Sequence, residues 1–205
     1  MPKITSISVQ SKNKNRCNIY VDGEFFSGVS METVYKSRLK VGLEIDEVSL
    51  KNILYDNERL EALNKAVDYL SKSLKTKKQV KDYLLKKGYE EDVVWQVIDK
   101  LKEYNYINDC EYSKRYIESV SKNQGKKLIE YKLMMKGVKK QDIETVFDDC
   151  EIDLKESAKN VAEKYLKNKE FTKENKAKAY RYLISRGFSY EEANYALSSF
   201  GEDEQ

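Results

Sequence analysis

Three lysines stand at the same distance from a recurring glycine. Each lies eleven residues before it, in the pairs Lys77 and Gly88, Lys126 and Gly137, and Lys176 and Gly187. Further lysines accompany the first two of these, namely Lys78, Lys81, Lys127 and Lys132. A lysine ammonium is a compact cation with three hydrogen-bond donors, so a row of them suits phosphates or carboxylates. The pattern predicts ionic binding of an acidic partner, and the alternative interpretation is a solvated helix face.

The sequence lacks the groups on which most enzymes rely. It contains no histidine, so the commonest general base and the commonest zinc ligand are missing. The segment NQGKKL has neither the earlier glycine nor the Ser or Thr of a phosphate-binding loop. We interpret Asp148 and Asp149 as solvated charge near a helix end. We therefore predict no catalysis, no cofactor and no metal.

The basic residues are concentrated before each glycine, although the net charge is only +3. Residues 72–87 hold seven basic side chains and one acidic, and residues 114–140 hold nine and two. Residues 173–187 hold five and one. If the repeated segments stack regularly, their lysines form a basic stripe that could follow a phosphate backbone or an acidic protein groove.

The glycines belong to a pattern that predicts helices. The segments LLKKGY, LMMKGV and LISRGF recur 49 and then 50 residues apart. Apolar residues stand eight and four positions before each glycine, and six, nine and ten positions after it, which is helical spacing. Each segment therefore predicts a helix, a glycine turn with positive φ and a second helix. Another apolar-periodic helix precedes each pair, so the unit is a three-helix repeat.

We predict a mostly α protein, with tandem three-helix repeats in an elongated curved array and a small N-terminal β-containing module. That module is expected to span 1–56, with strands near 4–10, 16–21 and 24–28 and short helices near 31–38 and 47–55. The repeats are expected at 57–108, 109–150 and 151–200, followed by an acidic tail at 201–205.

The remaining composition indicates the protein's surroundings. No apolar run reaches the roughly 18 residues of a membrane span, and the N-terminus lacks the pattern of a secretory signal. The scattered cysteines, Cys17, Cys110 and Cys150, are odd in number, which fits reduced thiols. We expect a cytoplasmic monomer with no membrane association.

Four segments of the chain form one pattern, namely the turns LLKKGY and LMMKGV, the segment YINDCEYSKRYI and the segment NQGKKLIEYKLMMKGV. In these segments the chain resembles the RecX family, which regulates the RecA recombinase. It covers about 58–200 and is weaker in the third repeat. Asn108 and Tyr112 depart mildly from the acidic and aromatic pattern typical of the family. The N-terminal β region resembles the extension of longer members.

The resemblance implies tandem helical repeats that bind the groove of the RecA filament on single-stranded DNA. It also implies inhibition of RecA ATPase and strand exchange, with roles in recombination, DNA repair and the SOS response. Weak direct DNA binding is compatible with it. One rival is a helical DNA-binding protein that acts without RecA, although the helices after the turns begin acidic. Another is a repeat scaffold for a different acidic partner.

Overall fold

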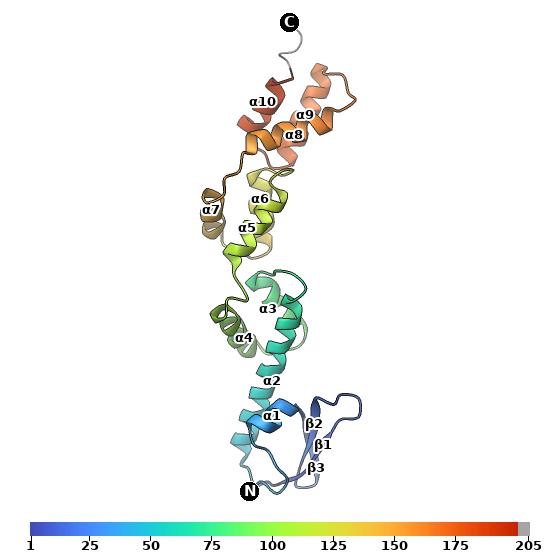
Figure 1. The fold of residues 1–205 in the computed structure, drawn as a ribbon, viewed down its shortest axis with the longest axis vertical. Helices are drawn as coiled ribbons and strands as arrows, with labels where there is room; N and C mark the ends of the chain where they lie inside the picture. Colours follow the sequence, from blue (N-terminus) through green and yellow to red (C-terminus); the bar gives the residue numbers. More distant parts are fainter. Residues whose placement is uncertain (201–205) are drawn as a thin grey trace. The chain divides into compact units, whose positions relative to one another are not determined.

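The computed structural model describes residues 1–200 and divides them between two compact units. The first unit comprises 1–73 and 80–106, and the second comprises 74–79 and the residues from 107 onward (Figure 1). The acidic tail predicted at 201–205 lies outside the described residues. Within residues 1–200, no helix combines the length and apolar character needed to cross a bilayer.

The N-terminal module is an antiparallel three-stranded sheet followed by a short helix. Its elements are β1 (Ile4–Val9), β2 (Arg16–Val21), β3 (Glu24–Ser30) and α1 (Met31–Lys36), and the strand order is β1-β2-β3. The predicted Asp-Gly turn joins β2 to β3, with positive φ at Asp22 and Gly23. The sheet packs on a core that includes Ile4, Ile19 and Leu50. The three predicted strands are confirmed, and β3 runs two residues further than expected.

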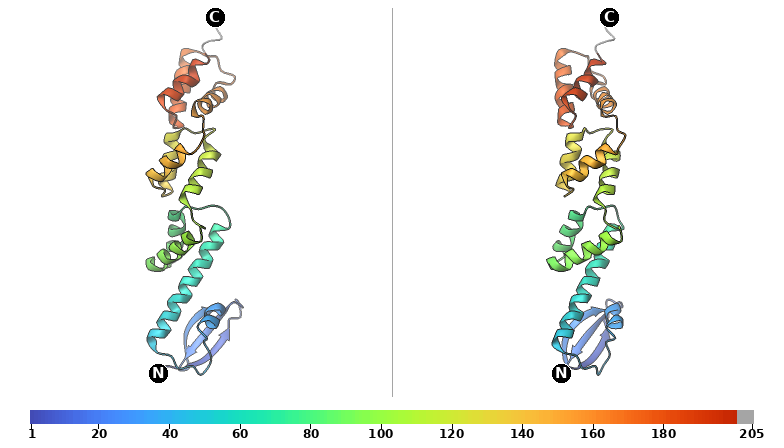
Figure 2. Two further views of the ribbon diagram at one scale, coloured as in Figure 1. Left: turned by 60° about the vertical axis from the view of Figure 1, so that its left-hand side comes forward. Right: turned by 90° about the vertical axis from the view of Figure 1, so that its left-hand side faces the viewer.

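A single long helix, α2 (Glu47–Leu70), follows the sheet (Figure 2). The expectation of a short helix ending near Tyr55, with a repeat helix beginning at Asn57, is therefore wrong. No glycine or proline interrupts the segment. Asparagine often disrupts helices by bonding to nearby backbone. The Asn57 side chain instead accepts from Ser30 N–H at 2.8 Å and from Thr33 Oγ1 at 3.0 Å, which fastens α2 to the sheet module.

Each of the three repeated segments is made of three helices. The first uses α2, α3 (Lys77–Lys86) and α4 (Glu91–Glu103); the second α5 (Asp109–Val120), α6 (Lys126–Met135) and α7 (Lys140–Asp148); the third α8 (Leu154–Leu166), α9 (Lys173–Ser185) and α10 (Tyr190–Ser198). The residues eight and four positions before each glycine have no exposed surface, as expected of core positions: Val80, Leu84, Ile129, Leu133, Ala179 and Leu183. The predicted fold class is thus confirmed.

The same turn ends the second helix of every repeat. φ is +90° at Gly88, +88° at Gly137 and +87° at Gly187, which confirms the predicted left-handed conformation. The residue after each glycine donates its N–H to the carbonyl five residues earlier, as Val138 does to Leu133 at 3.1 Å. This is the Schellman arrangement, which satisfies carbonyls that a helix end leaves unpaired.

Candidate functional site

Two contacts inside the second compact unit each join the start of one repeat's second helix to the end of the following repeat's second helix. The helices concerned are α3, α6 and α9. Thr76, just before α3, donates its hydroxyl to the carbonyl of Lys136 at the end of α6, at 2.6 Å. Gly125, just before α6, donates its N–H to the carbonyl of Arg186 at the end of α9, at 2.9 Å. Thr76 and Gly125 each stand twelve residues before their own glycine. The two junctions therefore use the same repeat positions.

These junctions bear on the recurring lysines. Lys77 is the first residue of α3 and Lys126 the first of α6, and both are half-buried. A cation at a helix start opposes the helix dipole, and neither α3 nor α6 has an acidic residue in its first turn. The carbonyl end of the following second helix lies at each start and offsets that cost. Packing between repeats thus accounts for part of the recurrence at Lys77 and Lys126.

The third lysine of the set has different surroundings. Helix α9 begins at Lys173, so Lys176 lies almost one turn inside it and is exposed. Its Nζ lies 5.6 Å from the centre of the Phe171 ring. Lys78 and Lys127 are also exposed, and Lys127 Nζ lies 5.4 Å from the ring of Tyr190 in the next repeat. Lys78, Lys127 and Lys176 are therefore the predicted binding residues with the most exposed surface.

Two further predicted binding residues are engaged in local contacts. Lys81 forms an ion pair with Glu91 at 2.7 Å and lies 4.4 Å from the centre of the Trp95 ring. Its hydrogen bond lowers the pKa of the Glu91 carboxyl below the ordinary value. Lys132 donates to Gln124 Oε1 at 2.8 Å and so ties α6 to the loop before it. Both side chains are half-buried, which limits what they can offer to a partner.

A cluster of one basic residue and two tyrosines, which we did not predict from the sequence, recurs in all three repeats. A basic residue directly before each turn glycine lies over a tyrosine that stacks on a second one. The groups are Lys87 with Tyr83 and Tyr69, Lys136 with Tyr116 and Tyr112, and Arg186 with Tyr182 and Tyr165. The available signal was the tyrosine five residues before Gly88 and Gly187.

The stacked tyrosines are half-buried. The ring centres of Tyr69 and Tyr83 are 4.1 Å apart with planes 8° from parallel. Arg186 donates to the Tyr182 hydroxyl through Nη2 at 2.7 Å, in addition to lying over the ring. Each group joins the first helix of its repeat to the second, and cation–π contacts of this kind contribute about 0.5–1 kcal/mol at partly exposed sites. Packing within the repeat is thus their evident role.

The described residues offer no arrangement for bound metal. Among residues 1–200, no three His, Cys, Asp or Glu side chains are grouped so as to hold an ion. The cysteines form no disulfide, and burial raises the pKa of the Cys110 and Cys150 thiols.

The fold and this surface define a tandem three-helix repeat protein with an N-terminal sheet module. Three family models match the chain: the regulatory protein RecX N-terminal domain over residues 2–46, the first RecX three-helix domain over 62–101 and the third over 151–197. The chain belongs to the RecX family of regulatory proteins. The matched segments coincide with the sheet module, the first repeat and the third repeat.

Full-length relatives support this assignment. The chain is 36% identical over 201 residues to the regulatory protein RecX of Clostridium tetani, covering 96% of this chain and 93% of the relative. It is 37% identical over 199 residues to that of Clostridium perfringens strain 13, covering 95% and 94%. A crystal structure of regulatory protein RecX matches with a TM-score of 0.74 at 26% identity, over 95% of this chain and 98% of that one. RecX from Lactobacillus salivarius matches with a TM-score of 0.64 at 26% identity, over 70% and 97%.

Proposed function

We propose that this chain inhibits the RecA recombinase by binding in the groove of the RecA filament on single-stranded DNA. Binding there lowers RecA ATPase activity and strand exchange. The observation that carries the proposal is that the second helix of each of the three repeats is basic. These helices carry the exposed lysines Lys78, Lys127 and Lys176. A filament repeats its own binding surface, so a ligand with repeated sites matches it.

Repetition also explains how weak contacts suffice. An exposed ion pair contributes only about 0.2–1 kcal/mol. Once one repeat is bound, the next repeat binds intramolecularly at a high effective concentration, so several weak contacts add to a useful affinity. Occupancy of the groove would exclude a second DNA strand and oppose the subunit rearrangement that accompanies hydrolysis. No catalytic group of the regulator is required for this mechanism.

The charge distribution disfavours the rival in which the helices after the turns read DNA by themselves. Those helices begin with carboxylates, namely Glu91 and Asp92 in α4, Asp142 in α7, and Glu191 and Glu192 in α10. Carboxylates at these positions would repel phosphates, whereas they suit the positive start of a helix. Direct DNA binding is therefore expected to be weak compared with binding to the RecA filament.

A titration of RecA ATPase on single-stranded DNA tests the proposal. We expect inhibition at concentrations well below that of RecA, and a parallel decrease in strand exchange. Binding to bare single-stranded DNA, measured at the same salt, should require much higher concentrations because it lacks the protein contacts. Tight binding to bare DNA with no change in RecA ATPase would support the rival DNA-binding function. If the protein neither inhibits RecA nor binds bare DNA, the result would favour the third alternative, a repeat scaffold for another acidic partner.

A further inference from the structure

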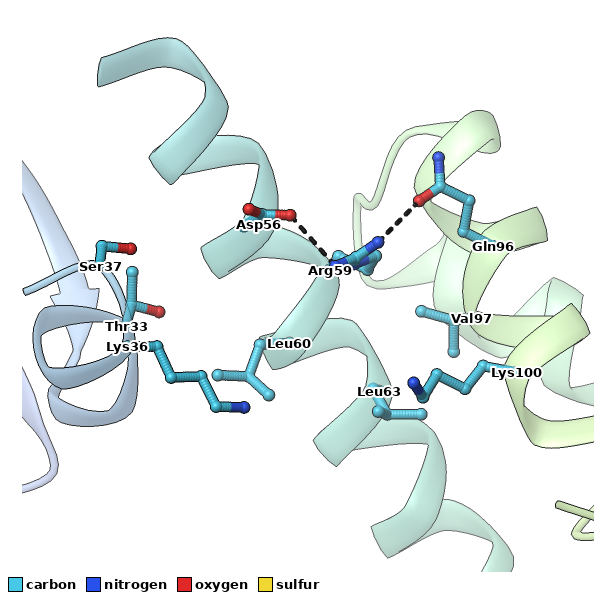
Figure 3. Close-up of a pocket in the computed structure, with 10 residues that line it drawn as sticks. All are labelled: Thr33, Lys36, Ser37, Asp56, Arg59, Leu60, Leu63, Gln96, Val97 and Lys100. Carbon is cyan, nitrogen blue, oxygen red and sulfur yellow. Dashed lines mark hydrogen bonds and ion pairs between the residues drawn. The ribbon is translucent and has the colours of Figure 1, made fainter. Parts of the chain in front are cut away.

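A cleft in the first unit lies between α1, α2 and α4 (Figure 3). Its volume is about 360 Å³. All the residues that line it belong to the same compact unit, because α2 is shared by the sheet module and the first repeat. The cleft is separate from the second-helix lysines discussed above, and none of those lysines lines it.

The floor of the cleft is aliphatic. Leu60 and Leu63, one helical turn apart on α2, are half-buried, and Val97 of α4 is buried beside them. Removing apolar surface from water is favourable, so an apolar side chain that packs on these leucines would contribute to binding. No aromatic side chain lines the cleft, so it provides no ring on which a nucleobase could stack.

Two lysines border the floor from opposite sides. Lys36 extends from α1 toward Leu60, and Lys100 extends from α4 toward Leu63 (Figure 3). Lys36 pairs with Glu32 at 2.6 Å in an exposed i,i+4 contact, which is weak and exchangeable. Within residues 1–200, no carboxylate forms an ion pair with Lys100, whose Nζ lies 5.4 Å from the centre of the Tyr104 ring. Both ammonium groups can therefore accept a new carboxylate.

Arg59 provides a third cation, held in place between the helices. Its Nη2 lies 3.1 Å from Asp56 Oδ1, and its Nη1 donates to Gln96 Oε1 of α4 at 3.4 Å (Figure 3). A guanidinium has five N–H donors, so these contacts leave donors for a carboxylate of a ligand. The lining side chains thus comprise three cations and one carboxylate around an apolar floor.

We propose that this cleft binds an acidic amphipathic peptide segment of a partner protein. The apolar side chains of that segment lie on Leu60 and Leu63, and carboxylates on either side of them pair with Lys36 and Lys100. Charge complementarity selects acidic ligands, and the aliphatic floor selects among them for those with apolar anchors. The carboxylate of Asp56 at the rim of the cleft would repel the phosphates of a densely charged nucleic-acid chain. The proposal goes beyond inhibition of RecA and does not depend on it.

A fluorescein-labelled peptide of about four helical turns, made of Glu and Ala with Leu at i, i+3 and i+7, tests the site. A matched probe carries Gln in place of each Leu. With the full chain, fluorescence anisotropy should show saturable binding of the Leu probe and binding about tenfold weaker of the Gln probe. The double variant Lys36→Glu with Lys100→Glu should weaken the Leu probe by about tenfold, because two attractions become repulsions.

The control is Lys40→Glu with Lys102→Glu, which changes the net charge equally at exposed positions that do not line the cleft. It should change the affinity by less than about threefold, through long-range charge only. Circular dichroism should show both variants folded. No binding of the Leu probe, or equal losses in the two variants, overturns the proposal, as does displacement of the probe by a single-stranded oligonucleotide. RecA ATPase assays of the same variants keep the two proposals separate, since RecA inhibition can fail while peptide binding persists.

Discussion

The hydroxyl of Thr76 and the carbonyl oxygen of Lys136 are 2.6 Å apart, although the two residues are separated by 60 positions in sequence. Thr76 is fully buried, and its Oγ1 also accepts from Gln79 N–H at 3.2 Å. One side chain thus caps the start of α3 and bonds to the end of α6. The contact joins two repeats through a single atom, and its removal should be measurable.

Thr76→Val should lower the free energy of unfolding by about 1–3 kcal/mol, because the isosteric side chain removes these partners from the Lys136 carbonyl and the Gln79 N–H. Chemical denaturation followed by circular dichroism measures the change. Thr145→Val is the matched control, since the exposed Thr145 hydroxyl bonds to the Gln141 carbonyl within the same helix, α7. The control should change stability by less than about 0.5 kcal/mol. Equal effects would show that the junction hydrogen bond contributes nothing.

The turn glycines should differ in their tolerance of alanine. A Cβ at Gly88 would meet nothing within 4 Å, whereas one at Gly137 would overlap the Lys78 side chain. Gly88→Ala should therefore lower the free energy of unfolding by about 1 kcal/mol, because an alanine there is strained only by its positive φ. Gly137→Ala should cost about 2–4 kcal/mol, since overlap adds to the same strain. Matching unfolding curves for the two variants would contradict a close approach at Gly137.

The helices and turns of the repeats could be predicted from the sequence, whereas the contacts between residues distant in sequence could not. The recurring glycines and apolar residues predicted the helices and turns because those signals are local. The continuity of α2 was missed because the partners of Asn57, namely Ser30 and Thr33, lie 27 and 24 residues away. The lysine pattern was visible in the sequence. Which lysines are exposed depends on partners across turns, such as Glu91 for Lys81, and spacing alone does not specify those.

Reversal of the exposed lysines should impair the proposed inhibition of RecA. We expect Lys127→Glu with Lys176→Glu to raise the concentration needed for half-inhibition of RecA ATPase by about tenfold, with little change in stability. The salt dependence should also become shallower, because each lost phosphate contact removes nearly one unit of slope. The control variant, Lys40→Glu with Lys102→Glu, should inhibit RecA ATPase almost as strongly as the parent protein does. Unchanged inhibition by the first pair, with its fold intact, would assign those lysines to the solvated surface.

Acid should destabilise the first unit partly through Asp46. Hydrogen bonds from the Ser49 hydroxyl and Ser49 N–H hold the pKa of this carboxyl below its ordinary value of 3.8. A lowered folded-state pKa contributes stability above the unfolded pKa, and that stability is lost as pH falls through the folded value. Asp46→Asn should therefore be less stable than the parent at pH 7. The difference should begin to shrink as pH falls below about 4 and should be smallest below the lowered folded-state pKa, where both side chains are neutral. A constant difference down to acid pH would show that the charge of Asp46 is not involved.

The junction has a consequence for how such a chain can change in length. Helices α3 and α6 each receive the final carbonyl of the following second helix at the position twelve residues before their own turn glycine, through the Thr76 hydroxyl in one case and the Gly125 N–H in the other. The acceptor is a backbone carbonyl in both junctions, so it does not depend on which side chain precedes the glycine. An inserted whole repeat would therefore bring a usable acceptor and would need only one donor twelve residues before its glycine. Gain or loss of a partial repeat would separate a donor from its acceptor.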